Sequence, residues 1–394
     1  MPDPNREERD LREAGLEALE AYPVPAVVCT VHTVLGMLEN VRRGLCAWPS
    51  LIRSAFVFDE VHSYSNRLFS YLLRFMTAVP GVPVLLMTAT LPPTRRKALE
   101  DCASNRGGIS IINGPAEREA APRYRLHLTA SEEAWERAVS CLGDGGKVLW
   151  VCNTVARAMG TVDKGLAHNL PVQPYHSRYR YRDRLKRHRE VIDGFKQERP
   201  PMFAITTQVA EMSLDLSADL LVSEVAPVPS MIQRMGRLNR YEEQPSVVCD
   251  ALFVRPESLL PYAEEDLRGV EEWFQRVANG EPQSQADLAA AFVEAWAEET
   301  DPVAAVEYCE WLDGLWRSLK DLRAIEEAGY TVEVIREEDL GSGPATELAI
   351  PMPVPKGRDW ESWAREGRYL VAPREEILYD PFRGAQWQNP TNSQ

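Results

Sequence analysis

Two neighbouring carboxylates stand at the end of an apolar stretch in the N-terminal part of the chain. Asp59 and Glu60 follow the apolar residues of SAFVFDEVH, a pattern that predicts a strand over 54–62. Ligands of α/β sheets bind at the carboxyl ends of the strands. An aspartate there can hold Mg²⁺ beside nucleotide phosphates, and the next acid can polarise an attacking water. A strand end that is merely solvated accounts for these two residues about as well.

A threonine pair follows the next predicted strand. MTATLPP places Thr88 and Thr90 at the end of the strand predicted over 82–90, one strand–helix unit after the acidic pair. Their hydroxyls can hydrogen-bond His62 or Asp59. Read alone, Thr-Ala-Thr before two prolines is typical of a loop. Only its position after DEVH favours a functional role.

A polar loop is predicted between two further strands, at 202–208 and 220–227. A loop rich in hydroxyl, amide and carboxylate groups at the ligand edge of a sheet can contact both a phosphate backbone and a bound nucleotide. The polar side chains of this loop, in TTQVAEMSLDLSADLLVSE, are Thr206, Thr207, Gln208, Glu211, Asp215 and Asp219.

The most specific pattern is QRMGRLNR, which places several cations at the opening of a predicted helix over 230–240. Arg237 and Arg240 are spaced to share a helical face. Guanidinium groups fit phosphate oxygens, and an arginine finger neutralises transition-state charge. A basic surface helix is the alternative, at about one in ten once the other patterns are considered. The remaining residues of interest here are Gln233, Arg234 and Gly236.

These groups require a scaffold of alternating strands and helices, which the sequence predicts twice. Strands that alternate with helices indicate a parallel sheet covered on both faces. The first series ends near a Gly/Pro/Ala-containing stretch at 105–122, which holds one short strand at most. The predicted domains are therefore 1–115, 116–255 and 256–394. The predicted elements are a helix at 6–20, a strand passing into a helix at 24–38, a helix at 64–78, strands at 147–154 and 172–176, and helices at 155–169, 179–197, 262–278, 285–298 and 302–328.

In this order and spacing, DEVH, TAT, TTQVAEMSLD and QRMGRLNR resemble motifs II, III, V and VI of superfamily 2 helicases. TQVAEMSLDLSADLLVSEVAPVPSMIQRMGRLNR and CTVHTVLG most resemble the CRISPR-associated helicase-nuclease of type I systems. The resemblance covers roughly residues 20–255. It implies an α/β fold with two RecA-like lobes, the first truncated at its N-terminus, followed by a mainly helical accessory domain.

The resemblance also implies roles for individual residues. The protein would be a cytoplasmic DNA helicase component that uses ATP and Mg²⁺, moves 3′ to 5′ on single-stranded DNA and works with a CRISPR effector complex. The implied catalytic residues are Asp59, Glu60, His62, Gln233, Arg237 and Arg240, with Asp59 and Glu60 holding Mg²⁺ and the two arginines reaching ATP held by the first lobe. The implied nucleotide contacts are Thr88, Thr90, Glu211, Asp215 and Arg234. The implied nucleic-acid contacts are Thr30, Asn153, Thr154, His176, Ser177, Arg178, Thr206, Thr207 and Gln208.

The segment RYRYRDRLKRHR, residues 178–189, has two interpretations of about equal weight. Its seven basic residues alternate with Tyr179 and Tyr181, so it can grip phosphates and stack a base. It can equally be a solvated helix face.

Two features of the family pattern are missing. The sequence contains no G-x-x-x-x-G-K-[ST] loop to cradle phosphates and no His-Asp metal cluster for a nuclease. We therefore expect weak or absent ATP hydrolysis from this chain alone. The expected explanation is a truncated gene product, or a nuclease or N-terminal motor segment that is encoded separately and joins it. The rival functions are a non-catalytic nucleic-acid-binding remnant and another superfamily 2 helicase that acts on RNA or in repair.

Composition sets the remaining expectations. No apolar run is long enough to span a membrane and the N-terminus is charged, so a cytoplasmic protein is expected. Seven scattered cysteines predict reduced core thiols and no zinc. The net charge is −15, yet residues 256–394 carry a balance of −17 and residues 1–255 one of +2. A nucleic-acid partner is therefore compatible with the first two thirds. Seven of the ten tryptophans lie in the last third, where a role in the core is expected.

Overall fold

The computed structural model describes most of the chain as two compact units, which are presented separately. The first unit lies within Met1–Ile112 and Glu298–Ala328, and the second within Asn113–Ala297 and Gly329–Gln394. The helices predicted at 6–20 and 302–328 lie outside the described residues. The described residues are 25–36, 42–88, 91–104, 107–196, 201–212, 214–241, 247–295, 331–354 and 360–388.

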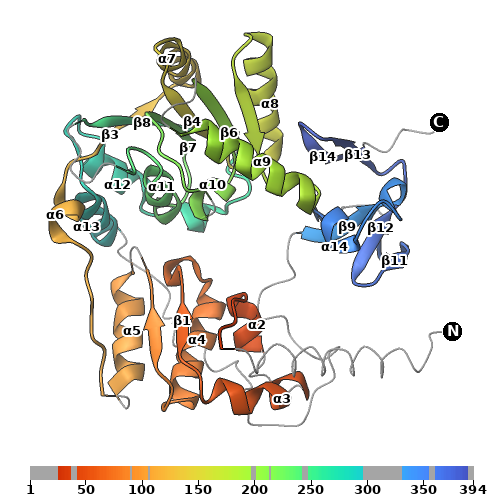
Figure 1. Ribbon diagram of the computed structural model, residues 1–394. Helices are drawn as coiled ribbons and strands as arrows, with labels where there is room; N and C mark the ends of the chain where they lie inside the picture. Colours follow the sequence, from red (N-terminus) through yellow and green to blue (C-terminus); the bar gives the residue numbers. More distant parts are fainter. Residues whose placement is uncertain are drawn as a thin grey trace. The chain divides into compact units, whose positions relative to one another are not determined.

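The first unit contains a two-stranded parallel sheet packed against helices (Figure 1). Its strands β1 and β2 pair in register, with Phe56 opposite Val84 and Phe58 opposite Leu86. Phe56 and Phe58 both contact Phe75, with ring centroids 4.8 and 5.5 Å apart. The elements are α2 (Val31–Gly36), α3 (Arg42–Leu51), β1 (Phe56–Phe58), the 3-10 helix η1 (Val61–Ser63), α4 (Asn66–Ala78), β2 (Val84–Leu86) and α5 (Pro93–Ala103).

Helix α4 forms where the sequence predicts a helix over 64–78. Ser65 caps it, because its hydroxyl accepts a hydrogen bond from the backbone N–H of Leu68 at 3.2 Å. The apolar run that follows is almost completely buried. Arg95 of α5, itself buried, donates to the carbonyl of Tyr64 at 2.8 Å and to the amide oxygen of Asn66 at 2.8 Å. The Ser65 cap and the two hydrogen bonds of Arg95 therefore fix the first turn of α4.

One predicted strand does not form in the first unit. Residues 25–30 have no regular structure, and α2 begins directly at Val31. Val28 in this stretch is 101% exposed. The stretch 105–122, for which one short strand at most was predicted, has no strand over 107–115. An apolar, β-branched stretch becomes a strand only where another strand satisfies its backbone, and neither stretch has such a partner among the described residues.

The second unit is built on a six-stranded sheet of order β3-β8-β7-β4-β6-β5, in which every pair is parallel. The predicted α/β fold is confirmed, although the sequence analysis missed β3, α7 and β8. The elements are α6 (Ala116–Ala120), β3 (Tyr124–Thr129), α7 (Ser131–Gly143), β4 (Lys147–Val151), α8 (Val155–Ala167), β5 (Val172–Tyr175), α9 (Tyr181–Gly194), β6 (Met202–Thr206), α10 (Val209–Met212), β7 (Leu220–Glu224), α11 (Val228–Met235), β8 (Cys249–Val254), the 3-10 helix η3 (Glu264–Leu267), α12 (Val270–Val277) and α13 (Gln285–Ala295).

Helices cover both faces of this sheet, as β4 shows. All five residues of β4 are buried. Val148 and Trp150 belong to the hydrophobic core shared with α7 and α8. Leu149 and Val151 belong to the core shared with α9, α10, α11, α12 and α13 on the other face. A central strand buried on both faces reads as a continuous apolar run, and for that reason KVLWV was recognised as a strand.

Helices α12 and α13 complete the core of the second unit. Trp273 of α12 is fully buried, and its indole N–H donates to the carbonyl of Leu288 in α13 at 3.2 Å. The core role expected for this tryptophan is confirmed, whereas Trp296, Trp311 and Trp316 lie outside the described residues. The predicted boundary at residue 255 falls inside this compact unit, because α12 and α13 pack on the sheet that precedes it.

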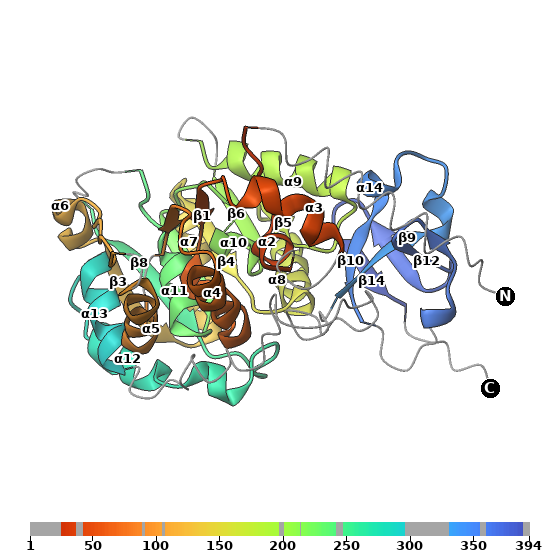
Figure 2. The ribbon, with the colours of Figure 1, turned by 90° about the horizontal axis from the view of Figure 1, so that it is seen from below.

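The C-terminal part, residues 331–388, is mostly β-structure (Figure 2). It consists of a four-stranded sheet of order β10-β9-β12-β11 and the hairpin β13–β14. A mainly helical domain was expected because Glu and Ala dominate the composition, but short β-branched and aromatic runs such as TVEVIR and ILYD favour strands here. The elements are β9 (Thr331–Arg336), the 3-10 helix η5 (Glu337–Asp339), α14 (Ala345–Leu348), β10 (Ile350–Pro353), the 3-10 helix η6 (Trp360–Ser362), β11 (Arg365–Glu366), β12 (Tyr369–Ala372), β13 (Ile377–Asp380) and β14 (Gly384–Trp387).

Among the described residues, no helix has the length and apolar character needed to cross a membrane.

Candidate functional site

In the first unit, the carboxyl ends of β1 and β2 bring the acidic pair and Thr88 to one edge. Because Phe58 pairs with Leu86, the residues that follow each strand leave the sheet at the same level. The hydroxyl of Thr88 lies 3.3 Å from Nδ1 of His62, so the predicted contact between these residues is present. Nδ1 of His62 also lies 3.5 Å from Oε2 of Glu60. Thr90 lies outside the described residues.

Glu60 has a left-handed backbone conformation, with φ 53° and ψ 42°. This conformation costs a residue other than glycine roughly 1–3 kcal/mol, and such strain clusters at ligand sites. The backbone N–H of Glu60 donates to Oδ1 of Asp59 at 2.9 Å, and the hydroxyl of Ser63 donates to the Glu60 carbonyl at 2.7 Å. These bonds hold the turn that orients the Asp59 carboxylate.

Burial and charge shift the titration of two groups beside the acidic pair. Burial lowers the pKa of His62, and the nearby Arg95 lowers it further, while Asp59 acts in the opposite sense. Burial, followed by the charges of Asp59 and Glu60, raises the pKa of Tyr64 to about 12. The Tyr64 hydroxyl therefore stays protonated and donates to the Asp59 carbonyl at 3.1 Å.

The residues at this edge fit one mode of Mg²⁺ binding. Among the described residues there is no cluster of three or more His, Cys, Asp or Glu side chains that could enclose a metal. Asp59 is exposed and uses Oδ1 to accept a backbone N–H. Mg²⁺ is commonly held by one or two carboxylates while it keeps waters and substrate phosphates. Asp59 fits that role, whereas Glu60 is turned towards His62.

In the second unit, the predicted nucleic-acid contacts follow three adjacent strands. Val151 of β4 and Tyr175 of β5 both pair with Thr206 of β6, so the three strands end at the same level. We call the residues that follow these ends, 152–154, 176–178 and 207–208, the carboxyl edge. Most of the nucleic-acid contacts predicted from the sequence lie at this edge, and the structure brings them together. Thr30 belongs to the first unit, where it is exposed.

Accessibility divides the carboxyl edge into supporting and surface residues. Asn153, Thr206 and Thr207 are buried, at 2%, 0% and 3% exposure. Thr154 and Gln208 are half-buried. Thr154 caps α8 by accepting from the backbone N–H of Arg157, and the amide of Gln208 donates to the carbonyl of Asn153 at 2.6 Å. The accessible groups therefore rest on a buried polar layer.

Arg234 is the centre of that layer and is completely buried. Its guanidinium donates to Oδ1 of Asn153 at 3.0 Å and to Oε1 of Glu211 at 2.8 Å. It also donates to the hydroxyl of Ser223 at 2.9 Å and to the carbonyl of Glu224 at 3.0 Å. The direct nucleotide contact predicted for Arg234 and its partner Glu211 does not agree with this geometry. Arg234 of α11 instead joins the loop after β4, helix α10 and the end of β7.

Arg237 and Arg240 do not share a helical face, contrary to the prediction. Helix α11 ends at Met235 with Gly236 as its cap, and Leu238 then forms a parallel bridge with Ala218. Arg237 is 8% exposed, and its Nε donates to the carbonyl of Ala210 at 2.9 Å. Arg240 is more accessible and forms an ion pair with Asp215, with 2.9 Å between Nε and Oδ1.

The helix propensity of the residues in QRMGRLNR did not predict that the chain leaves the helix after Met235. A glycine at a helix end favours termination, and Asn239 then takes a positive φ of 49° that turns the chain back. Gln233 remains on α11 and is half-buried. Arg240 is therefore the arginine of this motif best placed to meet a ligand.

The basic segment 178–189 mainly holds the C-terminal strands against the rest of the second unit, as both ribbon views show (Figures 1 and 2). Arg180 forms a bidentate pair with Asp339, at 2.9 and 2.7 Å, and stacks on the ring of Tyr379 at 4.1 Å. The Tyr179 hydroxyl donates to the carbonyl of Phe382 at 2.7 Å. Arg187 donates to the carbonyl of Pro381 at 2.8 Å. Structural contacts therefore occupy much of the segment in which phosphate binding and a solvated helix face were about equally expected from the sequence.

His176 belongs to the same anchor. It is fully buried, its Nδ1 accepts the backbone N–H of Arg178 at 3.1 Å, and its Nε2–H donates to the carbonyl of Arg383 at 3.0 Å. Gly384 is required beside it, because a Cβ there would lie 2.5 Å from the carbonyl oxygen of Arg178. Burial, with a smaller effect of Arg178, lowers the pKa of His176 to about 3. Its predicted contact with nucleic acid is not available to a side chain in this position.

Ser177 and Arg178 remain accessible at the carboxyl edge. Both are half-buried, and burial lowers the pKa of the Arg178 guanidinium. Neither side chain has a hydrogen-bond or ion-pair partner among the described residues. A partly desolvated guanidinium without a protein carboxylate is suited to an external anion such as a phosphate.

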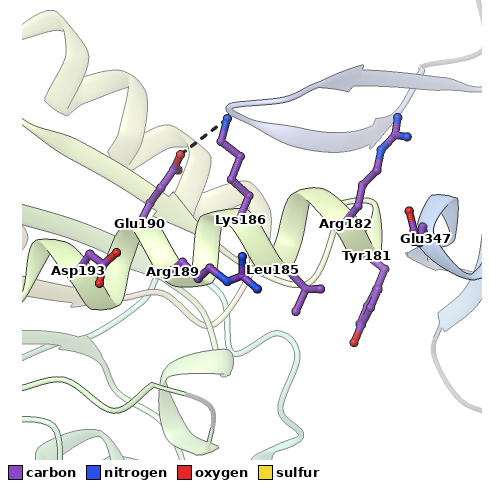
Figure 3. Close-up of a pocket in the computed structure, with 8 residues that line it drawn as sticks. All are labelled: Tyr181, Arg182, Leu185, Lys186, Arg189, Glu190, Asp193 and Glu347. Carbon is purple, nitrogen blue, oxygen red and sulfur yellow. Dashed lines mark ion pairs between the residues drawn. The ribbon is translucent and has the colours of Figure 1, made fainter. Parts of the chain in front are cut away.

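The outer side of α9 carries a second group of cations beside an open pocket of about 440 Å³ (Figure 3). Arg182, Lys186 and Arg189 project from the helix, and Lys186 lies 4.0 Å from Glu190. Tyr181 and Leu185 are 44% and 41% exposed on the same helix. Because Glu190, Asp193 and Glu347 also line the pocket, its cations are balanced by acids.

Sequence reasoning missed residues that support the site from neighbouring strand ends. Glu224 ends β7 and is 8% exposed; it accepts the backbone N–H of Asn153 at 2.6 Å and the Nε of Arg157 at 2.9 Å. Tyr262 lies 3.3 Å from the guanidinium of Arg234. The sequence did contain a signal for Glu224, because it is an acid at the end of the apolar run LLVSE, as Asp59 is at the end of FVF.

Comparisons with known proteins find a matching family model and similar sequences. Residues 144–243 match the family model described as "CRISPR-associated nuclease/helicase Cas3, C-terminal". A putative CRISPR-associated nuclease/helicase Cas3 of Myxococcus xanthus is 43% identical over 95% of this chain and 51% of its own length. The enzyme of that name from Streptococcus thermophilus is 30% identical over 48% of this chain and 24% of its own. The chain spans about half the length of the Myxococcus relative.

Solved structures share the fold. T. fusca Cas3 with ATP superposes with a TM-score of 0.71 at 19% identity, covering 91% of this chain and 56% of that chain. A chain of a CRISPR RNA-guided surveillance complex in a pre-nicking state gives a TM-score of 0.70 at 18% identity, with 94% and 61% covered. These likenesses show that the chain has the RecA-like α/β fold of those proteins.

Proposed function

Because the chain belongs to the family of Cas3-type superfamily 2 helicases, we propose that it is the motor part of a CRISPR-associated nuclease/helicase. In this role the carboxyl edge of the second unit binds single-stranded DNA. The complete protein uses ATP to move along that strand, in the 3′ to 5′ direction, and works in the cytoplasm with a CRISPR effector complex. Asp59 holds Mg²⁺, which brings positive charge to nucleotide phosphates when it is bound.

The observation that carries the proposal is the arrangement around Arg178. Its half-buried guanidinium has no carboxylate partner among the described residues and stands beside Ser177 at the end of β5. Thr154 follows β4, which lies on the other side of β6 from β5, and it caps the start of helix α8. Helix N-termini and unpaired guanidinium groups both favour phosphate oxygens. The carboxyl edge thus combines a cation, a hydroxyl and a helix start for a phosphate backbone.

Substitution of Arg178 tests this assignment. R178A should weaken binding of a labelled single-stranded oligonucleotide several-fold, measured by fluorescence anisotropy. It should also reduce the slope of log K against log salt by about 0.7, the value for one phosphate contact on a single strand. Arg125 on the outer strand β3, at the opposite end of the sheet, is the matched control, and R125A should leave both quantities unchanged. Equal losses in the two variants would refute a specific phosphate contact.

The absence of a G-x-x-x-x-G-K-[ST] loop favours a second candidate, a DNA-binding protein without turnover. DNA-stimulated ATP hydrolysis separates the two functions. DNA-stimulated turnover that disappears in D59N would support a motor. Because weak or absent hydrolysis is expected from this chain alone, the non-catalytic function would be supported only if DNA binding is intact and turnover stays absent after the part of the Myxococcus xanthus relative that the chain does not match is added. Equal affinity for RNA of the same sequence would favour a helicase outside CRISPR interference.

A further inference from the structure

A second pocket of the second unit, of about 290 Å³, lies where the first turn of α9 meets the C-terminal strands. Its walls combine buried apolar groups with aromatic rings and charged side chains. Pockets for small molecules start at about 300 Å³, so this volume suits one planar group rather than an extended ligand. We call it the tyrosine pocket, and its lining includes Tyr181, Arg184, Glu333, Ala349, Arg368 and Tyr369.

Tyr181 presents an accessible aromatic ring to this pocket. The residue is 44% exposed, and its backbone N–H donates to the carbonyl of Ala349 at 3.1 Å, which fixes the start of α9. Its side chain projects from the side of the helix that carries Leu185, whereas Arg182 and Lys186 project from the opposite side (Figure 3). An accessible ring held by a fixed backbone is a stacking platform for a nucleic-acid base.

Arg184 carries the unbalanced charge of the tyrosine pocket. Arg368 is balanced by Glu333, with 3.6 Å between the guanidinium and the carboxylate. The guanidinium of Arg184 is half-buried and lies 5.5 Å from the centre of the Tyr181 ring. It has no hydrogen-bond or ion-pair partner within the part of the chain that the structure describes. A cation beside an aromatic ring suits a ligand that is both planar and negatively charged, as a nucleotide is.

The tyrosine pocket adjoins the carboxyl edge. Only two residues separate Arg178 from Tyr181, so their Cα atoms lie at most about 11 Å apart. That distance spans about three nucleotides of a stacked strand, at about 3.4 Å each. The intervening Arg180 is held by its ion pair with Asp339. A strand that contacts Arg178 can therefore place a nearby base in the pocket.

We propose that the tyrosine pocket binds one unstacked base of the DNA strand that crosses the carboxyl edge. The base stacks on the ring of Tyr181, and the phosphate of the same nucleotide pairs with Arg184. This inference rests on the proposed function, because it requires a single strand at Arg178. Since every base has a flat aromatic face, the pocket accepts bases of any sequence.

Two labelled oligomers of equal length and charge test the proposal, one of thymidine nucleotides and one of abasic nucleotides. By fluorescence anisotropy, the unchanged chain should bind the thymidine oligomer at least about fivefold more tightly, the lower end of the effect of one stacked base. Y181A should lose that advantage and keep its affinity for the abasic oligomer, because it removes a ring and no charge. Y181F keeps the ring and should bind both oligomers as the unchanged chain does.

The salt dependence of binding separates the two parts of the pocket. R184A should weaken binding of both oligomers and reduce the slope of log K against log salt by about 0.7, the value for one phosphate contact on a single strand. Y181A should leave this slope unchanged. A slope that is the same in R184A and in the unchanged chain would remove the phosphate contact from the proposal and overturn it.

Tyr241 supplies the matched control. It is 52% exposed, and its hydroxyl donates to the carbonyl of Asp215, which precedes the amino end of β7 and so lies away from the carboxyl edge. Y241A should bind both oligomers as the unchanged chain does. Retained amide-exchange protection of α9 shows that Y181A has folded.

Three further results would overturn the proposal: equal affinity of the unchanged chain for the two oligomers, unchanged binding of the thymidine oligomer by Y181A, or equal losses in Y181A and Y241A. If R178A still reduces the salt slope in these cases, the DNA site at the carboxyl edge stands without the tyrosine pocket. Failure of the unchanged chain to bind either oligomer would instead overturn both the proposed function and this inference.

Discussion

At the scale of single residues, Arg234 connects the parts of the carboxyl edge. Its fully buried guanidinium bonds to Asn153 after β4, to Glu211 of α10 and to Ser223 and Glu224 of β7. A planar fork of donors can serve several acceptors at fixed angles, whereas a lysine ammonium cannot. Asn153 and Glu211 therefore depend on Arg234 for their positions.

Loss of this side chain should destabilise the second unit. R234A removes the cationic partner of Glu211, whose side chain is 11% exposed, and removal of one member of a buried ion pair costs about 3–5 kcal/mol. R234K should lose less, because it keeps the charge but not the fork. The free energy of unfolding is measured in urea through the fluorescence of Trp135 and Trp150, which lie in the hydrophobic core between the sheet of the second unit and helices α7 and α8. A loss of less than about 1 kcal/mol in R234A would argue against its connecting role.

His176 gives the second unit a dependence on pH. Its pKa is lowered from the ordinary value of 6.5 to about 3 by burial, so the unfolded chain takes up a proton in acid before the folded chain does. The stability due to neutral His176 is fully present above pH 6.5 and is lost as the pH falls towards 3. Between pH 7 and 5 this amounts to about 2 kcal/mol.

The comparison with H176Q isolates this effect. Glutamine does not titrate, so the decrease in unfolding free energy between pH 7 and 5 should be about 2 kcal/mol smaller in H176Q than in the unchanged chain. Urea denaturation at the two pH values measures the difference. Identical pH slopes for the two proteins would show that His176 is protonated as readily in the folded state.

At the scale of elements, α9 and the C-terminal strands are joined by a buried ion pair. Arg180 and Asp339 have side-chain exposures of 13% and 8% and form two hydrogen bonds. The coupling energy from the R180A/D339A double-mutant cycle should be about 2 kcal/mol. Arg255 and Glu271, an exposed pair of the same chemistry, should give about 0–1 kcal/mol. Equal coupling in both cycles would contradict the anchoring role of Arg180.

The strands and helices that carry the site were predictable, and their supporting contacts were not. β4 and β6 are buried on both faces, so their apolar runs are plain in the sequence. The outer strand β3 alternates buried and partly buried residues and was missed. The end of α11 at Met235 depends on the bridge between Ala218 and Leu238. Such a contact between distant residues leaves no local pattern.

The side-chain environments were the least predictable part. Asp59, Thr88 and the residues after β4, β5 and β6 were located because strand ends are visible in the sequence. The burial of Arg234 and His176 depends on partners up to 207 residues away. A basic or aromatic residue near a motif therefore reveals its chemistry, while the fold decides whether it faces a ligand or the core.

At the scale of the whole molecule, charge separates the regions of the chain. The net charge of −15 comes from residues 256–394, and the carboxyl edge lies in the nearly balanced part before them. Phosphate binding depends on local cations rather than on the total. The account therefore rests on one region of the second unit, the ends of β4, β5 and β6.

Amide exchange in the presence of single-stranded DNA tests that claim most directly. The account predicts slower exchange on DNA addition at residues 152–157, 176–180 and 207–211, which contain and follow the carboxyl edge. Exchange along β3 and the hairpin β13–β14 should not change. Protection confined to β3, to the C-terminal hairpin or to the outer side of α9 would contradict the assignment of the DNA site.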